Sequence, residues 1–227
     1  MTSEQEKKLA GEAAAELVSN GMVIGLGTGS TVRYFIERLG MLADEGISVT
    51  GVPTSLATER LAIQAGINLA TLEDRPELDM AVDGADEVDK GLDLIKGMGG
   101  ALFREKVVAK ASKRFVVVVD SSKLVSRLGE RTPVPVEVHI FGWKATKKWL
   151  RSLGCEPALR MSGPAPYITD NGNFIIDCSF GAIPEPAALE QRINNVPGVL
   201  ENGIFAGMTS LLIVGRGSGV ERVERPR

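Results

Sequence analysis

The sequence predicts an α/β protein in which a larger part built on a parallel sheet carries a smaller α+β part. Over the first 120 residues, short apolar runs of strand type alternate with segments whose apolar residues recur at helical spacing. The pattern changes near residue 130, where a proline-rich segment begins. A fully apolar run at 209–217 then matches the strands of the first part, so we expect the smaller part to be an insertion.

The elements of the larger part follow from local patterns. The capping-box spacing of Ser3 and Glu6, with apolar residues at every fourth position after it, predicts a first helix that ends at Gly21. Residues 22–27 predict a strand, and the next helix has an apolar stripe of Val32, Phe35, Ile36 and Leu39. Further strands are expected at 47–53, 67–72, 78–83 and 114–120, with helices at 55–65 and 99–111.

The smaller part reads strand, helix, hairpin, helix, strand, which is the order of a ferredoxin-like α+β domain. The Asn171-Gly172 pair lies between alternating apolar residues and predicts the hairpin turn. We therefore expect one domain at 1–130 plus 206–227 and a second at 131–205. The tail at 218–227 is expected to be solvated and frayed.

Charge and hydropathy exclude several classes of function. The chain has 26 basic and 29 acidic side chains and a net charge of -3, so it has no basic field that would follow a nucleic acid backbone. The N-terminus is charged and lacks the apolar core of a signal peptide, and no apolar run could span a bilayer. We expect a cytoplasmic protein with neither nucleic acid nor a membrane as partner.

The cysteines and the histidine offer no familiar reactive group. Cys155 and Cys178 lie far apart and outside any C-x-x-C spacing, so we expect two small buried hydrophobes. The single histidine, His139, has no companion for zinc binding or for a catalytic triad. Any chemistry must therefore use Asp, Glu, Lys, Ser and Thr.

The first candidate cluster is "GLGTGST", Gly25 to Thr31, between a predicted strand and a predicted helix. Backbone N–H groups at such a helix start favour an anion, and the hydroxyls add donors, so phosphate is the expected ligand. The cluster is not a dinucleotide fingerprint, because the third glycine is replaced by Ser30 and no acid ends the next strand. A glycine turn that serves only close packing is the alternative.

The second cluster is "VDGADEVD", in which Asp83 and Asp86 follow an apolar strand. Ligands of open α/β sheets bind beyond the carboxyl ends of the strands, so both aspartates are well placed to meet one. A divalent-metal site and an ordinary acidic surface turn are the alternatives.

The third cluster is "KGMGGALFREK", with Lys96, a glycine loop, and Glu105 on the helix that follows. Glycines allow backbone donors to approach a substrate oxygen, and the lysine could neutralise charge that develops there. Glu105 has apolar neighbours at helical spacing and is expected to face inward, although Arg104 passes nearly the same test. An exposed glutamate on a helix surface is the alternative.

The three clusters together, with "PVPVEV", "TDNGNFIIDC" and "PGVLENGIFAG", resemble the type A ribose-5-phosphate isomerase family across essentially the whole chain. The resemblance implies a Rossmann-like α/β domain with a ferredoxin-like α+β domain inserted before the final strand. It also implies interconversion of ribose 5-phosphate and ribulose 5-phosphate through an enediolate, with no metal and no organic cofactor. A homodimer or homotetramer that binds a small sugar phosphate is expected.

Residue matching carries the roles of the family over to this chain. Glu105 matches the catalytic base, while Asp83, Asp86 and Lys96 match residues that hold the sugar and assist ring opening. Family members commonly have a glycine where this chain has Met98, which affects the expected geometry of the glycine loop. The remaining substrate-binding matches are Thr28, Gly29, Ser30, Thr31, Gly84, Ala85, Gly97, Met98, Gly99, Lys123 and, as a phosphate contact, Lys7.

Two other functions fit parts of the pattern. A sugar-phosphate-sensing domain would bind the ligand without catalysis, but the glutamate of "REK" beside the glycine loop and the lack of an attached DNA-binding segment argue against it. A nucleotide-dependent enzyme is suggested by the G-x-G-x-G turn, and the missing ribose-binding acid argues against it.

Overall fold

The computed structural model describes residues 2–225, which divide into two compact units. The first unit contains the chain up to residue 85, residues 104–123, and the chain from residue 208 onward. The second unit contains residues 86–103 and 124–207. The sequence-based division, with breaks after residues 130 and 205, differs mainly in keeping 86–103 with the first part.

The first unit is built on a seven-stranded sheet of order β16-β15-β7-β4-β1-β2-β3. Six of these strands are parallel, and β16 at one edge runs antiparallel to β15. This confirms the predicted α/β class with a Rossmann-like parallel sheet. The strands are β1 (Val23–Leu26), β2 (Thr50–Pro53), β3 (Asn68–Leu69), β4 (Met80–Asp83), β7 (Phe115–Asp120), β15 (Leu211–Arg216) and β16 (Gly219–Glu224).

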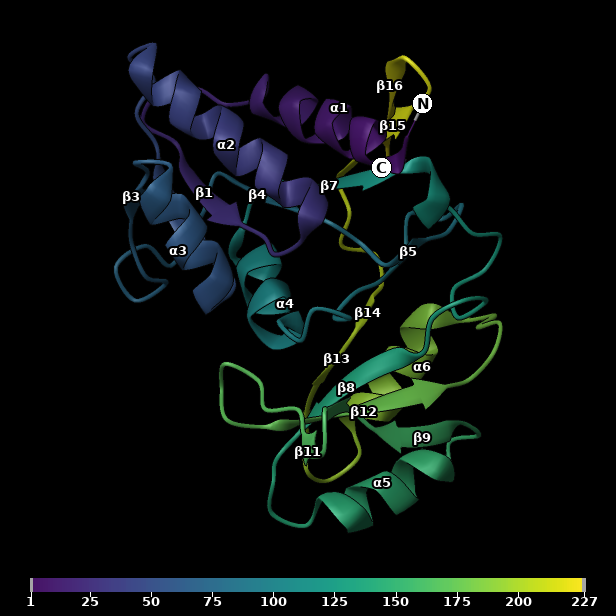
Figure 1. The fold of residues 1–227 in the computed structure, drawn as a ribbon. Coiled ribbons are helices and arrows are strands. Elements are labelled where there is room, and N and C mark those ends of the chain that lie inside the picture. The colour runs from purple at the N-terminus through teal and green to yellow at the C-terminus, as the bar shows by residue number, and fades with distance from the viewer. Residues whose placement is uncertain (1, 226–227) are drawn as a thin grey trace. The chain divides into compact units, whose positions relative to one another are not determined.

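Helices cover both faces of this sheet (Figure 1). Alternate strand residues such as Ile24 and Val82 are buried in one core with residues of α1 (Ser3–Ala15), α2 (Ser30–Asp44) and α3 (Leu56–Gln64). The other face carries α4 (Leu102–Ala111), whose Val108 packs so closely on Gly25 that a side chain there would overlap it. In the described part of the chain, no helix is long and apolar enough to cross a membrane.

The second helix agrees with its predicted stripe, but the first helix differs from expectation at both ends. Val32, Phe35, Ile36 and Leu39 of α2 are all buried. The capping box of α1 starts one residue earlier than predicted, because the Thr2 hydroxyl accepts from the Gln5 N–H while the Gln5 side chain accepts from the Thr2 N–H. The helix ends at Ala15 and not near Gly21, because the chain then tightens into turns with i→i+3 hydrogen bonds.

The predicted frayed tail is wrong for residues 219–224, which form β16. Gly217 adopts a left-handed conformation, with φ at +55°, and reverses the chain so that β16 pairs with β15 along its whole length. Val220 packs against the core of the first unit, and Arg222 donates to Glu16 of α1 at 2.6 Å. No residue of this strand is fully buried, so its sequence lacks the apolar alternation of a core strand. The last two residues of the tail lie outside the described part.

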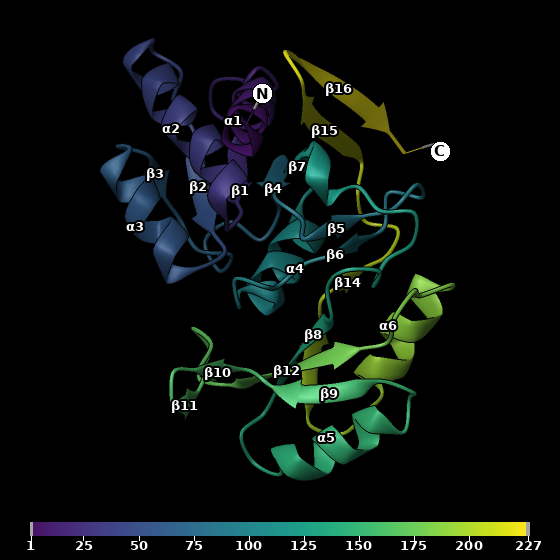
Figure 2. The same ribbon diagram turned by 45° about the vertical axis from the view of Figure 1, so that its right-hand side comes forward.

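The second unit contains a four-stranded antiparallel sheet of order β13-β8-β12-β9, which is the order of a ferredoxin-like domain. Both helices of the unit cover one face of this sheet (Figure 2). Val136 of β8 and Cys178 of β12 belong to the hydrophobic core that the sheet forms with these helices. Glu137 and Asp177 belong to the opposite face of the same strands. The elements are β8 (Val134–Val138), α5 (Trp143–Arg151), β9 (Glu156–Leu159), β12 (Phe174–Ser179), α6 (Pro186–Asn194) and β13 (Val199–Asn202).

The predicted hairpin at Asn171-Gly172 is correct as a turn but wrong as a strand pairing. Gly172 has φ at +79°, and its N–H donates to Thr169 O at 2.9 Å. The residues before the turn form no strand, and β12 pairs with β8 and β9 instead. The side chains of Thr169 and Asn173 donate to the buried Glu137 carboxylate at 3.0 and 2.9 Å, and these bonds hold the turn in place of a ladder. The short hairpin lies earlier, between β10 (Met161–Ser162) and β11 (Ala165–Pro166).

A three-stranded sheet of order β14-β6-β5 completes the second unit and escaped prediction. Each of its strands, β5 (Glu87–Val88), β6 (Leu94–Ile95) and β14 (Ile204–Phe205), has two residues, too few to show a periodicity. Glu87 is 1% exposed, and its carboxylate accepts the backbone N–H groups of Gly129, Arg131 and Thr132 at 2.6, 2.8 and 2.7 Å.

The cysteines agree with the expectation. Both Cys155 and Cys178 are free and buried in the second unit. A hydrogen bond with the Cys155 thiol, together with burial, raises the pKa of the Cys178 thiol far above its ordinary value. Neither is an exposed, reactive thiolate.

Candidate active site

The predicted phosphate loop connects β1 to α2 in the first unit. Gly29 is the N-cap of α2 with φ at +135°, a conformation that favours glycine. No side chain caps the start of this helix by a hydrogen bond to its first N–H groups. Ser30 is exposed, whereas Thr31 is buried. An uncapped helix start at the carboxyl end of a central strand is a favourable place for an anion.

Asp83 and the phosphate loop form one bonded group. Asp83 ends β4 and is 2% exposed, and its Oδ1 accepts the N–H of Gly84 at 2.7 Å and that of Thr28 at 3.1 Å. A side chain on Gly27 would overlap the Asp83 carboxyl group. Close packing accounts for the glycines at positions 25 and 27, and the backbone conformation accounts for Gly29.

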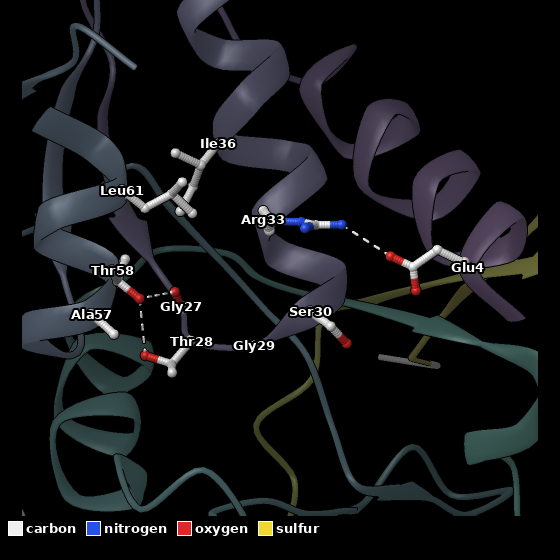
Figure 3. Close-up of a pocket in the computed structure, with 10 residues that line it drawn as sticks. All are labelled: Glu4, Gly27, Thr28, Gly29, Ser30, Arg33, Ile36, Ala57, Thr58 and Leu61. Atoms are coloured by element: carbon white, nitrogen blue, oxygen red, sulfur yellow. Dashed lines mark hydrogen bonds and ion pairs between the residues drawn. The ribbon is translucent and has the colours of Figure 1, made fainter. Parts of the chain in front are cut away.

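The Thr28 hydroxyl lies among hydroxyl groups at the start of α3, of which Figure 3 shows that of Thr58. It lies 2.8 Å from both Thr54 Oγ1 and Ser55 Oγ, and 3.1 Å from Thr58 Oγ1. Thr58 also donates to Gly27 O at 2.8 Å. We call Thr28, Thr54, Ser55 and Thr58 the hydroxyl cluster. The sequence did not point to its last three members as site residues, although "TSLAT" at a strand-to-helix junction was a usable signal.

A cavity of about 400 Å³ lies beside the phosphate loop. Arg33 and Glu4 both line it, and the Arg33 guanidinium donates to Glu4 Oε1 at 2.9 Å (Figure 3). The Tyr34 hydroxyl donates to the same carboxylate oxygen. This hydroxyl bond holds the pKa of Glu4 below its ordinary value. Lys7, the predicted phosphate contact, lies 3.6 Å from Glu4 with its side chain 20% exposed. The cavity is lined by Glu4, Gly27, Thr28, Gly29, Ser30, Arg33, Ile36, Ala57, Thr58 and Leu61.

Glu105 lies on α4 and is 4% exposed, which confirms the expectation that it faces inward. Arg104, which passed nearly the same sequence test, is only half-buried. The exposed-glutamate alternative is therefore wrong. A carboxylate removed from bulk water on a rigid helix can take and return a proton at a fixed position.

Lys123 ends a single 3-10 turn, η1 (Ser121–Lys123), directly after β7. Two carboxylates fix this turn: Asp120 accepts the Ser122 N–H at 3.0 Å, and Glu6 accepts the Ser121 hydroxyl at 2.7 Å. The hydroxyl of Ser121 is also the main reason that the pKa of Glu6 is lowered. Lys123 is thus half-buried, and a turn fixed by hydrogen bonds places it just beyond the carboxyl end of β7.

Lys96 follows β6 in the second unit and is 2% exposed. Its N–H donates to Gly203 O at 2.8 Å, and a side chain on Gly203 would overlap the Lys96 carbonyl. Its Nζ lies 5.6 Å from the centroid of the Phe205 ring, a cation–π contact. The backbone of Lys96 is therefore fixed by Gly203, and its ammonium group lies beside the Phe205 ring.

The glycine loop, residues 97–100, follows Lys96 and contacts Asp86. Gly97 and Gly100 have φ at +104° and +82°, and the Gly100 N–H closes the turn onto Gly97 O at 3.0 Å. The Met98 N–H donates to Asp86 Oδ2 at 2.9 Å, so the loop and this aspartate are in direct contact. The Met98 side chain is 44% exposed. The departure from glycine therefore leaves the backbone donor at this position bonded to the aspartate.

Arg160, Tyr167 and Asp177 also belong to this site and escaped prediction. Arg160 Nη1 donates to Gly97 O at 2.8 Å and to Met98 O at 3.0 Å, and the Tyr167 hydroxyl lies 3.4 Å from Gly99 O. These three residues lie more than sixty positions along the chain from the glycine loop, so no local sequence pattern linked them to it.

The predicted site residues divide between the two units. Among residues 2–225, no group of three or more His, Cys, Asp or Glu side chains could hold a metal ion. The first unit holds Lys7, Thr28, Gly29, Ser30, Thr31, Asp83, Gly84, Ala85, Glu105 and Lys123, and the second holds Asp86, Lys96, Gly97, Met98 and Gly99.

The parallel sheet of the first unit, with an uncapped helix start after β1, is typical of the class of α/β proteins that bind a phosphorylated small molecule beyond the carboxyl ends of their strands. The model of the ribose 5-phosphate isomerase A (phosphoriboisomerase A) family matches residues 50–219. A ribose-5-phosphate isomerase A of Gluconobacter oxydans is 49% identical over 222 residues, which covers 96% of each chain. The chain belongs to the ribose 5-phosphate isomerase A family.

Solved structures agree with this assignment. A D-ribose-5-phosphate isomerase in complex with phospho-erythronic acid is 47% identical, with a TM-score of 0.96 over 99% of this chain and 100% of that one. The ribose 5-phosphate isomerase A of Methanocaldococcus jannaschii is 44% identical, with a TM-score of 0.94 over 98% of this chain and 100% of that one. The inserted ferredoxin-like domain is thus part of a shared architecture.

Proposed function

We propose that the chain interconverts ribose 5-phosphate and ribulose 5-phosphate, with Glu105 as the base. Family membership over nearly the full length supports the reaction, and the 4% exposure of Glu105 is the observation that supports its role. The relative solved with phospho-erythronic acid, a phosphorylated sugar acid, supports a sugar phosphate as the ligand class.

The reaction moves a carbonyl group between two neighbouring carbons of the sugar. The base removes the proton next to the carbonyl, an enediolate forms, and the same carboxyl group returns the proton to the adjacent carbon. One carboxylate suffices for both transfers. Positioned proton transfer of this kind typically contributes about 10²- to 10⁴-fold in rate, so other groups must lower the remaining barrier.

We assign the stabilisation of the enediolate oxygen to Lys96 and the amides of the glycine loop. Lys96 is buried, so its charge acts in a medium that screens less than water. Gly97 and Gly100 hold the loop in a conformation that other residues rarely adopt, so its amides need little rearrangement during the reaction. Removal of one such donor typically costs about 10²- to 10³-fold.

Ring opening and phosphate binding fall to the remaining residues. The sugar is mostly cyclic in water, and Asp83 and Asp86 act as the acid and base that open it, one of them protonated. The phosphate binds at residues 28–31, with Lys123 and Lys7 as cationic contacts, and fixes the orientation of the sugar. The uncapped start of α2 supports this assignment.

The assembly and conditions of the reaction are also proposals. We propose a cytoplasmic homodimer or homotetramer that needs neither a metal nor an organic cofactor. The residues assigned above supply the acid, base and electrophilic groups that the chemistry requires. Dialysis against a chelator is expected to leave turnover unchanged, and a loss restored by magnesium would favour the metal interpretation of the aspartates.

The decisive experiment incubates the purified chain with ribose 5-phosphate alone and follows the formation of ribulose 5-phosphate. Glu105→Gln is expected to abolish turnover while the variant still binds the sugar phosphate. Glu12→Gln, a change on the exposed side of α1, is the matched control and should leave the rate unchanged. Retained turnover in Glu105→Gln would remove Glu105 from the role of base, and binding without turnover in the unmodified chain would favour the sugar-phosphate sensor.

A further inference from the structure

The Arg160 side chain lies on the face of the four-stranded sheet that no helix of the second unit covers. It follows β9, and its side chain is 12% exposed. Asp177 of β12 accepts from Nε at 3.0 Å and also from Nη2, so the guanidinium is held in a two-pronged pair. This pair fixes the plane of the guanidinium group. It therefore also sets the direction of Nη1, the nitrogen that is not bonded to Asp177.

That donor binds two consecutive carbonyls of the glycine loop. Nη1 donates to Gly97 O at 2.8 Å and to Met98 O at 3.0 Å. The next carbonyl, Gly99 O, faces the Tyr167 hydroxyl at 3.4 Å. Three successive peptide groups thus turn their oxygens towards side chains of one short segment that follows β9.

The orientation of the carbonyls dictates the orientation of the amides. In a trans peptide the N–H points opposite to the C=O of the same plane, and none of the described peptide bonds is cis. Binding of Gly97 O therefore directs the Met98 N–H away from Arg160, where it meets Asp86 Oδ2 at 2.9 Å. Binding of Met98 O directs the Gly99 N–H away from Arg160 in the same manner. The Gly100 N–H is used within the loop, on Gly97 O.

We infer that Arg160, oriented by Asp177, is a positioning residue for the isomerisation. It sets the peptide planes of residues 97–99 so that the Met98 amide orients Asp86 and the Gly99 amide is presented to the sugar oxygen that becomes negatively charged. The inference rests on the proposed function. It gives the ferredoxin-like domain a part in the chemistry, because the residue pair that orients the loop belongs to β12 and to the segment after β9.

Arg160→Met tests the inference, because it keeps an unbranched apolar stem and removes every donor. A displacement of about 1 Å in such a loop can cost about 10²-fold, so we expect kcat to fall by about 10- to 10²-fold with KM changed by less than about threefold. Amide resonances of Met98 and Gly99 in ¹H–¹⁵N spectra should shift in the free enzyme. Arg160→Lys, which keeps one donor and the charge, should recover part of kcat.

Arg151→Met is the matched control. Arg151 pairs with Glu156 at 2.8 Å in the same domain, but both side chains are well exposed, so kcat and the Met98 and Gly99 resonances should not change. Asp177→Asn is the second variant for the case that Arg160→Met does not fold, and it should lower kcat by a smaller factor with the same amide shifts.

The outcomes are distinguishable. Wild-type kcat in a folded Arg160→Met, or a lower kcat in Asp177→Asn without amide shifts at residues 98 and 99, would overturn the positioning role. A loss of kcat that only follows a loss of thermal stability, shared by Arg151→Met, would overturn it as well. Failure of the unmodified chain to isomerise ribose 5-phosphate would instead overturn the proposed function.

Discussion

The phosphate loop before α2 and the glycine loop before α4 have similar compositions but are held in different ways. The phosphate loop is held by nearby strands: the Thr28 amide binds Asp83 at the end of the neighbouring strand β4, and the hydroxyl cluster binds the loop from the start of α3. The glycine loop depends on two left-handed glycines and on Arg160, a side chain from a different part of the sequence. The contacts that hold either loop join residues far apart in the sequence, 26 to 55 positions for the phosphate loop and 62 to 68 for the glycine loop, so no local pattern reveals them.

We expect the largest effect from Gly27→Ala. The new methyl group would overlap the Asp83 carboxyl group and approach the backbone of β4, so either the strand or the aspartate must move. The melting temperature should fall by several degrees, and kcat/KM by about 10²-fold. Gly219→Ala is the matched control, because its methyl group would meet no atom within 4 Å. Equal kcat/KM in both variants would refute the close contact between the loop and Asp83.

Gly100→Ala probes the second loop and should have a smaller effect on stability. The methyl group would overlap the Tyr167 hydroxyl, and the residue would keep an unfavourable φ of +82°. We expect kcat to fall about tenfold. Adding Tyr167→Ala removes the overlap but not the backbone strain, so it should restore only part of kcat. Full recovery in the double variant would show that the left-handed conformation is not needed.

A smaller effect is expected from Thr58→Val in the hydroxyl cluster. The change keeps the shape of the side chain but removes the donor to Gly27 O, a buried acceptor. Loss of such a bond typically costs about 1–3 kcal/mol, which urea denaturation can measure. Thr71→Val, which removes an exposed hydroxyl bonded to Asp74, is the control and should cost less. The reverse order would remove the hydroxyl cluster as a support of the phosphate loop.

The smallest effect is expected from Tyr34→Phe. Its hydroxyl is the main reason that the pKa of Glu4 is lowered, so the titration of Glu4, followed by NMR, should move upward in the variant. A carboxyl group whose pKa is lowered in the folded state stabilises the protein above its unfolded pKa, and this contribution is lost as the pH falls through the folded pKa. The variant should therefore be less stable near neutral pH and converge with the wild type in acid. An unchanged Glu4 titration would contradict this prediction.

Most of the fold could be predicted because its elements have clear periodicity and punctuation. The apolar stripe of Val32 to Leu39 and the uninterrupted run of β7 needed no tertiary information. The errors have physical causes as well. Strands β5, β6 and β14 are too short for any pattern, and β16 is a charged edge strand without a fully buried residue. The Asn171-Gly172 turn is held by side-chain bonds to Glu137 and not by a strand ladder.

The candidate site, like the fold, could be predicted only in part. The inward orientation of Glu105 agrees with the sequence reasoning, whereas the contact of Asp86 with the glycine loop was not predicted. The hydroxyl cluster and the Arg160–Asp177 pair were not predicted, because they orient the site residues from elsewhere in the chain. Residues that support a site carry no reactive chemistry of their own, so composition and spacing do not single them out.

The buried carboxylate of Glu87 has a consequence for the segment at 129–132. It receives three backbone N–H groups there, in a stretch without helix or strand. Amide protons at Gly129, Arg131 and Thr132 should thus exchange with deuterated water as slowly as those of a central strand, although the ribbon resembles an ordinary surface connection. A buried carboxylate can therefore make an irregular segment as rigid as a strand of a sheet.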